Sequence, residues 1–511
     1  MGALQHTDAT QADLDPDSPS PAPLPKKTRP WRRVGWLIVL MALIALAFAV
    51  HREVQTSRWQ ARVFSEWAAK LTYRVAPGAS DAIVYPGAGP FDQRLGYRAL
   101  GEFLPRLLKR NYMIESQARF SEALMDYSRH GLFIPYAEKI QAGLTITDCR
   151  AAPLYQFNYP TQLYARFDDI PPLMIHSLLF IENRALLDPE PAQANPAVDW
   201  PRFAKAAWSQ VARQLHLPGQ AAGGSTLATQ LEKYRHSPDG LTLSGSEKIR
   251  QMLSASVRAY QHGPDTLAAR RNIVRDYLNS VPLSAVPGHG EVHGMAEGLR
   301  VWYGADFVQV NRALQDTATT PASLAARGLA LREVLSLMIA QRRPSHYLAN
   351  GRDELKQLTD SHLRLLAQNA VIDPPLLKAA LAARVTYRDW LQQPTLQPID
   401  SNKGVSVARS RLATLLNRPL YDLDRLDLAA TSTLQAELQT QVTAYLKQLA
   451  DPVFAGNIGL LGERLLTPAS TPQVRYSFTL FERTADGSRV RVQTDNTDQP
   501  FDINEGSKLE L

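Results

Sequence analysis

Residues 222–233 (AGGSTLATQLEK) have the composition of a segment that binds a polar ligand. Gly223 and Gly224 carry no side-chain bulk, so a ligand can lie directly against their backbone. Ser225 and Thr226 follow, and leucines then recur at helical spacing. A turn that opens a helix in this way offers free backbone N–H groups to an anion. The alternative is a glycine turn that only caps a helix.

The carboxylate of Glu182 is the second feature that could do chemistry. On a helix over residues 173–188, at about 100° per residue, Glu182 points away from the polar side chains and has apolar neighbours three and four positions away. Such a carboxylate must be paired, be neutralised or line a cleft, and in a cleft it can serve as a general base. The alternative is a side chain at a helix end that reaches water. The polar arc of this helix contains His176, Ser177, Asn183, Arg184 and Asp188.

Further segments accompany these two in a fixed order. They are DIPPLMIHSLLFIENRALL (169–187), Asp199-Trp200, GGSTLATQLEK (223–233), EKIRQMLSA (247–255), NIVRDYLN (272–279), GMAEGLRVWYGAD (294–306) and LREVLSLMIAQRRPSHY (331–347). This order resembles the family 51 peptidoglycan glycosyltransferases, the glycan-polymerising domain of class A penicillin-binding proteins. The pattern of that family in the second main segment is GGST-[IL]-[TS]-QQL-x-K.

The resemblance implies a reaction and a set of site residues. Glu182 would be the general base on the 4-hydroxyl of the acceptor sugar, which attacks the anomeric carbon of the growing chain and displaces undecaprenyl diphosphate with inversion. Lys233 and Lys248 match basic positions that neutralise the diphosphate, whereas Arg250 matches no family position and a solvated role for it is equally open. The substrate-binding residues implied are Asn183, Gly223, Gly224, Ser225, Thr226, Gln230, Lys233, Lys248, Arg250 and Asn279.

Several positions depart from the family pattern. The aspartate after the general base is Asn183, one glutamine of the second segment is Thr229, and a glutamate of the fourth is Arg275. The second catalytic carboxylate of the family is replaced by Gln251, which keeps the shape but loses the charge, so metal ligation would be weakened. Glu247 lies one helical turn earlier on the same face and could partly substitute. The resemblance implies no permanently bound cofactor and leaves open a divalent cation, Mg or Mn, accompanying the diphosphate.

Composition narrows the class of protein. The chain has 511 residues, enough for two to four domains, and a net charge of +7, which suits an anionic lipid phosphate or membrane surface. Its basic residues form no long run, so nucleic acid is not expected as a partner. The single cysteine, Cys149, excludes an intramolecular disulfide and a cysteine zinc cluster.

An uncharged apolar run, VGWLIVLMALIALAFAV, occupies residues 34–50. This is about the minimum length for a membrane span. Basic residues precede the run, which by the positive-inside rule places the N-terminus in the cytoplasm and the main body in the periplasm of a bacterial inner-membrane protein. A signal peptide cleaved after Ala47 or Ala49 is the alternative. The basic residues are Lys26, Lys27, Arg29, Arg32 and Arg33.

The fold expected is mainly α, with a lysozyme-like helical glycosyltransferase domain, a small α+β module before it and a short α/β segment after it. Strand-like pieces lie at 82–86, 132–137 and 144–148, and residues 315–328 look like an inserted loop. The expected parts are a disordered cytoplasmic tail (1–33), a transmembrane helix (34–51), a membrane-proximal helix with the α+β module (52–168), the glycosyltransferase domain (169–391), a linker (392–425) and the start of a transpeptidase-like domain (426–511). No Ser-x-x-Lys nucleophile is found, so acyl transfer is not supported.

The leading hypothesis is a membrane-anchored glycosyltransferase that polymerises lipid II. Its expected partners are lipid II, the nascent glycan, the membrane and other cell-wall synthesis proteins. A catalytically degenerate relative that binds lipid-linked glycan or acts as a scaffold is the main alternative. A lytic transglycosylase is a third hypothesis, but the GGST segment serves a diphosphate that glycan cleavage does not involve.

Overall fold

The computed structural model describes residues 30–87, 89–200, 202, 205, 225–389, 403–485 and 487–497, and it divides into two units, residues 1–54 and 55–511. The first unit contains helix α1 (Pro30–Thr56) as far as Val54. Its part Val34–Thr56 is long and apolar enough to cross a membrane, which is compatible with a single-pass anchor and also with a signal sequence. The tail expected over 1–33 lies outside the described residues as far as residue 29.

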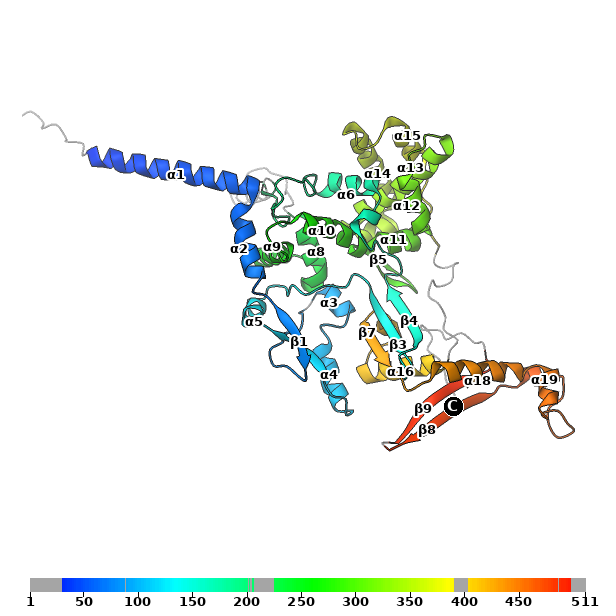
Figure 1. Cartoon of the computed structure of the whole chain (residues 1–511). Coiled ribbons are helices and arrows are strands. Elements are labelled where there is room, and N and C mark those ends of the chain that lie inside the picture. The colour runs from blue at the N-terminus through cyan, green and yellow to red at the C-terminus, as the bar shows by residue number, and fades with distance from the viewer. Residues whose placement is uncertain are drawn as a thin grey trace, which may run out of the picture. The chain divides into compact units, whose positions relative to one another are not determined.

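The second unit is mainly helical, with small sheets, which confirms the expected fold class (Figure 1). Its helices are α2 (Arg58–Ala68), α3 (Pro90–Arg94), α4 (Leu100–Leu108), α5 (Glu122–Arg129), α6 (Pro172–Glu182), α8 (Leu227–His236), α9 (Gly245–Ala259), α10 (Leu267–Ser280), α11 (Gly294–Gly298), α12 (Phe307–Gln315), α13 (Pro321–Ala340), α14 (Arg352–Gln368), α15 (Pro374–Ala382), α16 (Lys403–Leu416), α17 (Leu420–Leu423), α18 (Ala436–Gln448) and α19 (Pro452–Asn457). Its strands are β1 (Tyr73–Pro77), β2 (Ser116–Phe120), β3 (Ala142–Thr147), β4 (Pro153–Tyr159), β5 (Pro282–Val286), β6 (Gly290–His293), β7 (Asp427–Thr431), β8 (Ser477–Thr484) and β9 (Gly487–Asp495).

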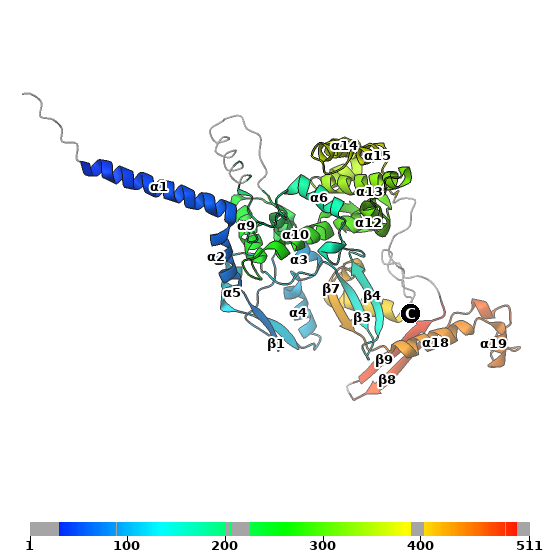
Figure 2. The same ribbon diagram turned by 45° about the horizontal axis from the view of Figure 1, so that its top comes forward.

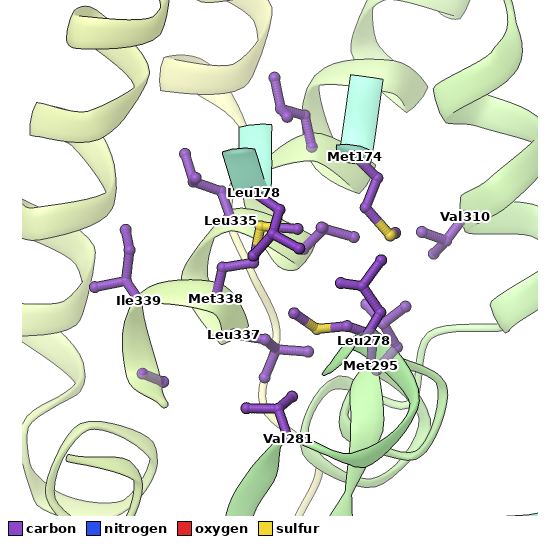
Figure 3. Close-up of a cluster of buried hydrophobic side chains, with 14 of the residues drawn as sticks. Met174, Leu178, Leu278, Val281, Met295, Val310, Leu335, Leu337, Met338 and Ile339 are labelled. Carbon is purple, nitrogen blue, oxygen red and sulfur yellow. The ribbon is translucent and has the colours of Figure 1, made fainter. Parts of the chain in front are cut away.

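Helix α13 lies at the centre of the main hydrophobic core. Residues 330–340 are buried all around the helix, as expected for a helix without a polar face. Figure 3 shows side chains of α6, α10 and α13 meeting in one cluster, among them Met174, Leu278 and Leu335. Because α6 packs on α13, the last residue of α6, Glu182, lies close to the residue that follows α13, Gln341.

A three-stranded sheet joins segments that are far apart in the sequence. Strand β3 lies between β4 and β7 (Figure 2) and pairs antiparallel with β4 and parallel with β7, with Leu144 opposite Leu428. Helices α16 and α17 contribute Leu416 and Leu423 to the apolar cluster beneath β3. Part of the expected linker, 392–425, is therefore helical and packed, whereas residues 390–402 lie outside the described range. The sheet therefore combines strands from two of the expected parts, β3 and β4 from 52–168 and β7 from 426–511.

Local predictions agree with the structure in part. Residues 144–147 form a strand, as expected, and β8 pairs antiparallel with β9 near the C-terminal end of the described residues. The segments 82–86 and 132–137 are not strands. The prediction of an inserted loop at 315–328 is wrong for its second half, because helix α13 begins at Pro321. Thr320 is the N-cap of this helix, and its hydroxyl accepts a hydrogen bond from the backbone N–H of Ser323.

Candidate active site

A cavity of about 740 Å³ lies where α6, α8 and the end of α13 meet. Several predicted site residues line it: Glu182, Ser225, Gln230 and Lys233. Tyr234, Arg202, Gln341 and Arg342, for which no substrate role was predicted, also line it. The cavity therefore combines a carboxylate, amides and cations in a space large enough for a ligand of more than one ring.

Helix α6 ends at Glu182, which places this carboxylate at the cavity. Asn183 leaves the helix with φ −161° and ψ 96°, so the helix predicted over 173–188 is too long. The polar arc predicted for that helix is wrong for the same reason, and Ser177 is buried and donates to the backbone oxygen of Leu173. Arg202 donates to the backbone oxygen of Glu182 and thus satisfies a carbonyl group at the end of the helix.

Both carboxylate oxygens of Glu182 accept hydrogen bonds from side-chain amides. The Nε2 of Gln230 donates to Oε2 over 2.9 Å, and the Nε2 of Gln341 donates to Oε1 over 3.2 Å. The Tyr234 hydroxyl lies 2.9 Å from Gln341 Oε1 and 3.3 Å from Gln230 Oε1, and thus links the two amides. The carboxylate is held in one orientation from two helices.

Two lysines supply positive charge, Lys233 in the cavity and Lys248 bound to a residue that lines it. Lys233 lines the cavity with its Nζ 4.3 Å from the centroid of the Tyr234 ring, and it forms no hydrogen bond or ion pair with other described residues. Lys248 Nζ donates to Ser225 Oγ over 2.8 Å and to Thr229 Oγ1 over 3.4 Å. Burial lowers the pKa of Lys233, while burial and the charge of Lys233 lower the pKa of Lys248 to about 8. An anion bound here would offset the unfavourable burial of both charges.

The start of α8 explains the role of Ser225 and Thr226 in the glycine-rich segment 222–233. Thr226 is the N-cap, its hydroxyl accepting from the backbone N–H of Thr229, and it is almost fully buried. It therefore positions the helix, whereas Ser225 lines the cavity. Gly223 and Gly224 lie outside the described residues.

Three other predicted substrate-binding residues have different surroundings. Arg250 pairs with Glu247 over 2.7 Å. Asn279 is buried and bonds both backbone groups of Tyr164, over 2.9 and 2.8 Å, which is a structural role. Asn183 forms the C-cap of α6 and is not among the residues that line the cavity.

Gln251 is fully buried in a polar network. Its Nε2 donates to Ser237 Oγ over 2.9 Å and to Thr242 Oγ1 over 3.0 Å, and Ser237 in turn donates to Glu247. Glu247 is thus committed to Ser237 and Arg250 and does not restore a charge at the cavity. These amide and hydroxyl groups do not fit a divalent cation, and the described part of the chain contains no group of three or more His, Cys, Asp or Glu arranged to hold a metal.

Restoring a carboxylate at this position should destabilise the protein. We expect Gln251→Glu to cost about 1–3 kcal/mol, because glutamate cannot donate to Ser237 or Thr242 and adds a buried negative charge beside Glu247. The midpoint of urea unfolding of the full chain in detergent measures this, with the exposed Gln357→Glu in α14 as control. Unchanged stability together with new magnesium binding would contradict this view of Gln251.

A buried ion network holds the other end of α8. His236 Nδ1 lies 2.8 Å from Asp92 Oδ2, and Glu138 contacts His236, Arg235 and Arg258. Burial opposes the charge of His236, but Glu138 and Asp92 outweigh this and raise the pKa of His236 to about 9. Burial favours a neutral Glu138, but Arg258, Arg235 and His236 hold its pKa well below the usual range. Sequence reasoning missed this network because its members come from separate segments.

Comparisons with known proteins agree with this geometry. The family model for transglycosylases matches residues 150–369, a range that contains α6, α8, α13 and the residues around Glu182. Comparison of the chain with curated proteins gives no match. The match confirms the resemblance seen in the sequence motifs and supports a family 51 transglycosylase domain in residues 150–369.

Proposed function

We propose that the protein is a membrane-anchored peptidoglycan glycosyltransferase that polymerises lipid II with release of undecaprenyl diphosphate. The observation that carries the proposal is the fixed carboxylate of Glu182 in the same cavity as Lys233, with Lys248 bound to Ser225 at its wall. Transfer from a diphosphate donor needs a base for the attacking hydroxyl and cations for the leaving group, and this cavity offers both.

The proposed step assigns one role to each group. Glu182 takes the proton from the 4-hydroxyl of the acceptor sugar as that oxygen attacks the anomeric carbon of the donor. The bond from this carbon to the diphosphate oxygen breaks, and Lys233 and Lys248 stabilise the negative charge that develops on the diphosphate. Gln230 and Gln341 keep the carboxylate aimed at the acceptor.

The proposal includes a topology and partners. Helix α1 would be a single-pass anchor in the inner membrane, with a cytoplasmic N-terminus and the second unit in the periplasm. Lipid II and the nascent glycan would reach the cavity from the membrane, and other cell-wall synthesis proteins would be further partners. A divalent cation, if required, would arrive with the diphosphate.

A second candidate function is favoured by Gln251. Because an amide stands where the family has a carboxylate, a protein that binds lipid-linked glycan without polymerising it also fits the site. Incubation of the full chain with labelled lipid II separates the two functions. Long glycan strands would support the polymerase, binding without product would support the degenerate relative, and degradation of preformed glycan would overturn both in favour of a lytic enzyme.

Removal of either lysine should weaken binding of a diphosphate-like ligand. We expect Lys233→Met and Lys248→Met each to lose about 1.5–3 kcal/mol of affinity for a phosphoglycolipid such as moenomycin. Because the pKa of Lys248 is about 8, binding by the wild type should weaken as pH rises through 8, and Lys248→Met should lose this dependence. Calorimetric titration measures both effects, with exposed Lys356→Met as control. Equal affinity in all variants would place the lysines outside the site.

The amide of Gln341 should affect turnover more than binding. We expect Gln341→Leu to lower kcat about tenfold, because one oxygen of Glu182 loses the hydrogen bond that orients it. KM should change little, and the exposed Gln309→Leu in α12 is the control. Steady-state polymerisation kinetics measure both constants, and a rise in KM at constant kcat would assign Gln341 to substrate binding instead.

A further inference from the structure

One wall of the cavity comes from outside the matched domain. Pro90, the first residue of α3, lines the cavity together with Gly240, although the family match begins only at residue 150. The Cγ atom of Pro90 lies 3.5 Å from the position that a Cβ would take on Gly240. The module that precedes the transglycosylase domain, whose role the sequence did not reveal, therefore reaches the candidate active site.

The start of α3 is pressed against the last turn of α8. A Cβ on Gly89 would lie 2.1 Å from the backbone oxygen of Arg235 and 2.4 Å from the Cα of His236. No side chain fits in that space, so glycine is required here for close approach. Helix α8 also carries Gln230 and Lys233, which places Pro90 next to the helix that supplies the cavity with polar groups.

The wall is anchored by buried polar contacts. Asp92 of α3 is almost fully buried and lies 2.8 Å from His236 Nδ1. The Tyr136 hydroxyl donates to the other oxygen of Asp92 over 2.6 Å, and Arg258 of α9 donates to the backbone oxygen of Tyr136 over 3.2 Å. Because these groups are buried and paired, moving α3 away from α8 would leave charges unpaired, so the wall is rigid.

The cavity that Pro90 lines also has groups that are suited to an uncharged part of a ligand. Leu241 and Pro282 line the cavity as well, and so does His293. Burial and the charge of Arg94 lower the pKa of His293 to about 4, so its ring is neutral at pH 7. The cations of the cavity can hold a diphosphate, whereas prolines, leucine and a neutral imidazole match the sugar or its substituent.

We propose that Pro90 is a specificity-determining residue, with α3 forming a wall that limits the size of the glycosyl group admitted beside Lys233. This inference rests on the proposed function. The inference gives the membrane-proximal module a role in the selection of substrates. A larger residue at position 90 should exclude bulky substrates, and a smaller one should admit them more readily.

The test compares two substrates on variants of the full chain. Lipid II with its complete stem peptide and lipid II without peptide are supplied to the wild type, Pro90→Trp and Pro90→Ala, and kcat/KM is measured for each. We expect Pro90→Trp to reduce kcat/KM for the larger substrate about tenfold more than for the smaller, and Pro90→Ala to shift the ratio in the opposite direction. Pro105→Trp and Pro105→Ala, at an exposed proline of α4, should leave the ratio unchanged.

Each outcome has a distinct meaning. Hydrogen exchange of the α8 amides should match the wild type in the Pro90 variants, which excludes a general loss of fold as the cause. A wild type that uses both substrates, with the same ratio in every variant, would overturn the role of Pro90 alone. A wild type that converts neither substrate, whether or not it binds them, would overturn the proposed function and this inference with it.

Discussion

Replacement of Glu182 by glutamine is expected to reduce the rate of lipid II polymerisation by about 10² to 10⁴. The amide keeps the shape of the side chain at the end of α6 but cannot accept the proton of the attacking hydroxyl. Affinity for a phosphoglycolipid should stay within a few-fold, because the lysines that bind its phosphate are unchanged. Single-turnover assays with labelled lipid II measure the rate, and titration with the inhibitor measures binding.

The matched control is Glu463→Gln, at an exposed position far along the chain from the cavity residues. It should retain wild-type activity in the same assays. Activity of Glu182→Gln within a few-fold of the wild type would remove Glu182 from the role of general base. Joint loss of activity and inhibitor binding would instead indicate a damaged cavity.

Replacement of Glu138 by glutamine is expected to destabilise the protein by about 3–5 kcal/mol. Glu138 is the carboxylate shared by Arg235, His236 and Arg258, and its removal leaves these three buried cations with only one carboxylate partner each, Asp276, Asp92 and Glu232. The largest effect should appear at the last turn of α8, because Arg235 and His236 both belong to it. Urea unfolding measures the loss of stability, and hydrogen exchange of the α8 amides locates it.

The control is Glu122→Gln, at an exposed position of α5 in the same module. This variant should unfold at the same urea concentration as the wild type. If Glu138→Gln unfolded at the same urea concentration as the wild type, with unchanged exchange at α8, the network would not hold the helix. The rigidity assigned to the wall at Pro90 would then lose its basis.

The sequence predicted the parts of the site that follow from local pattern. The sequence alone indicated the apolar helix that carries Glu182, the Ser-Thr start of α8, and the spacing of Gln230 and Lys233 on that helix. Their meeting at one cavity followed from the family resemblance and agrees with the structure. The end of α6 was not readable, because an apolar pattern continues past the residue at which the backbone turns.

Contacts between distant segments could not be predicted from one sequence. Gln341 meets Glu182 only because α13 packs on α6, and Pro90 meets the cavity only because α3 packs on α8. Nor did the sequence reveal that the segment after residue 426 joins β3 in one sheet. Gln251 illustrates a different limit of prediction from sequence. The motif shows that a charge is lost at this position, but it does not show whether the side chain faces the ligand or, as the structure has it, buried hydroxyl groups.

The most direct measurement is the stereochemistry of the product formed from lipid II, whose sugar is α-linked to its diphosphate. A base-assisted, single displacement at the cavity predicts strands with new β-glycosidic bonds and one released undecaprenyl diphosphate for each bond. Nuclear magnetic resonance of the glycan and mass spectrometry of the lipid would establish both. Retained configuration, or free reducing ends without chain growth, would contradict the role assigned to Glu182 and its lysines.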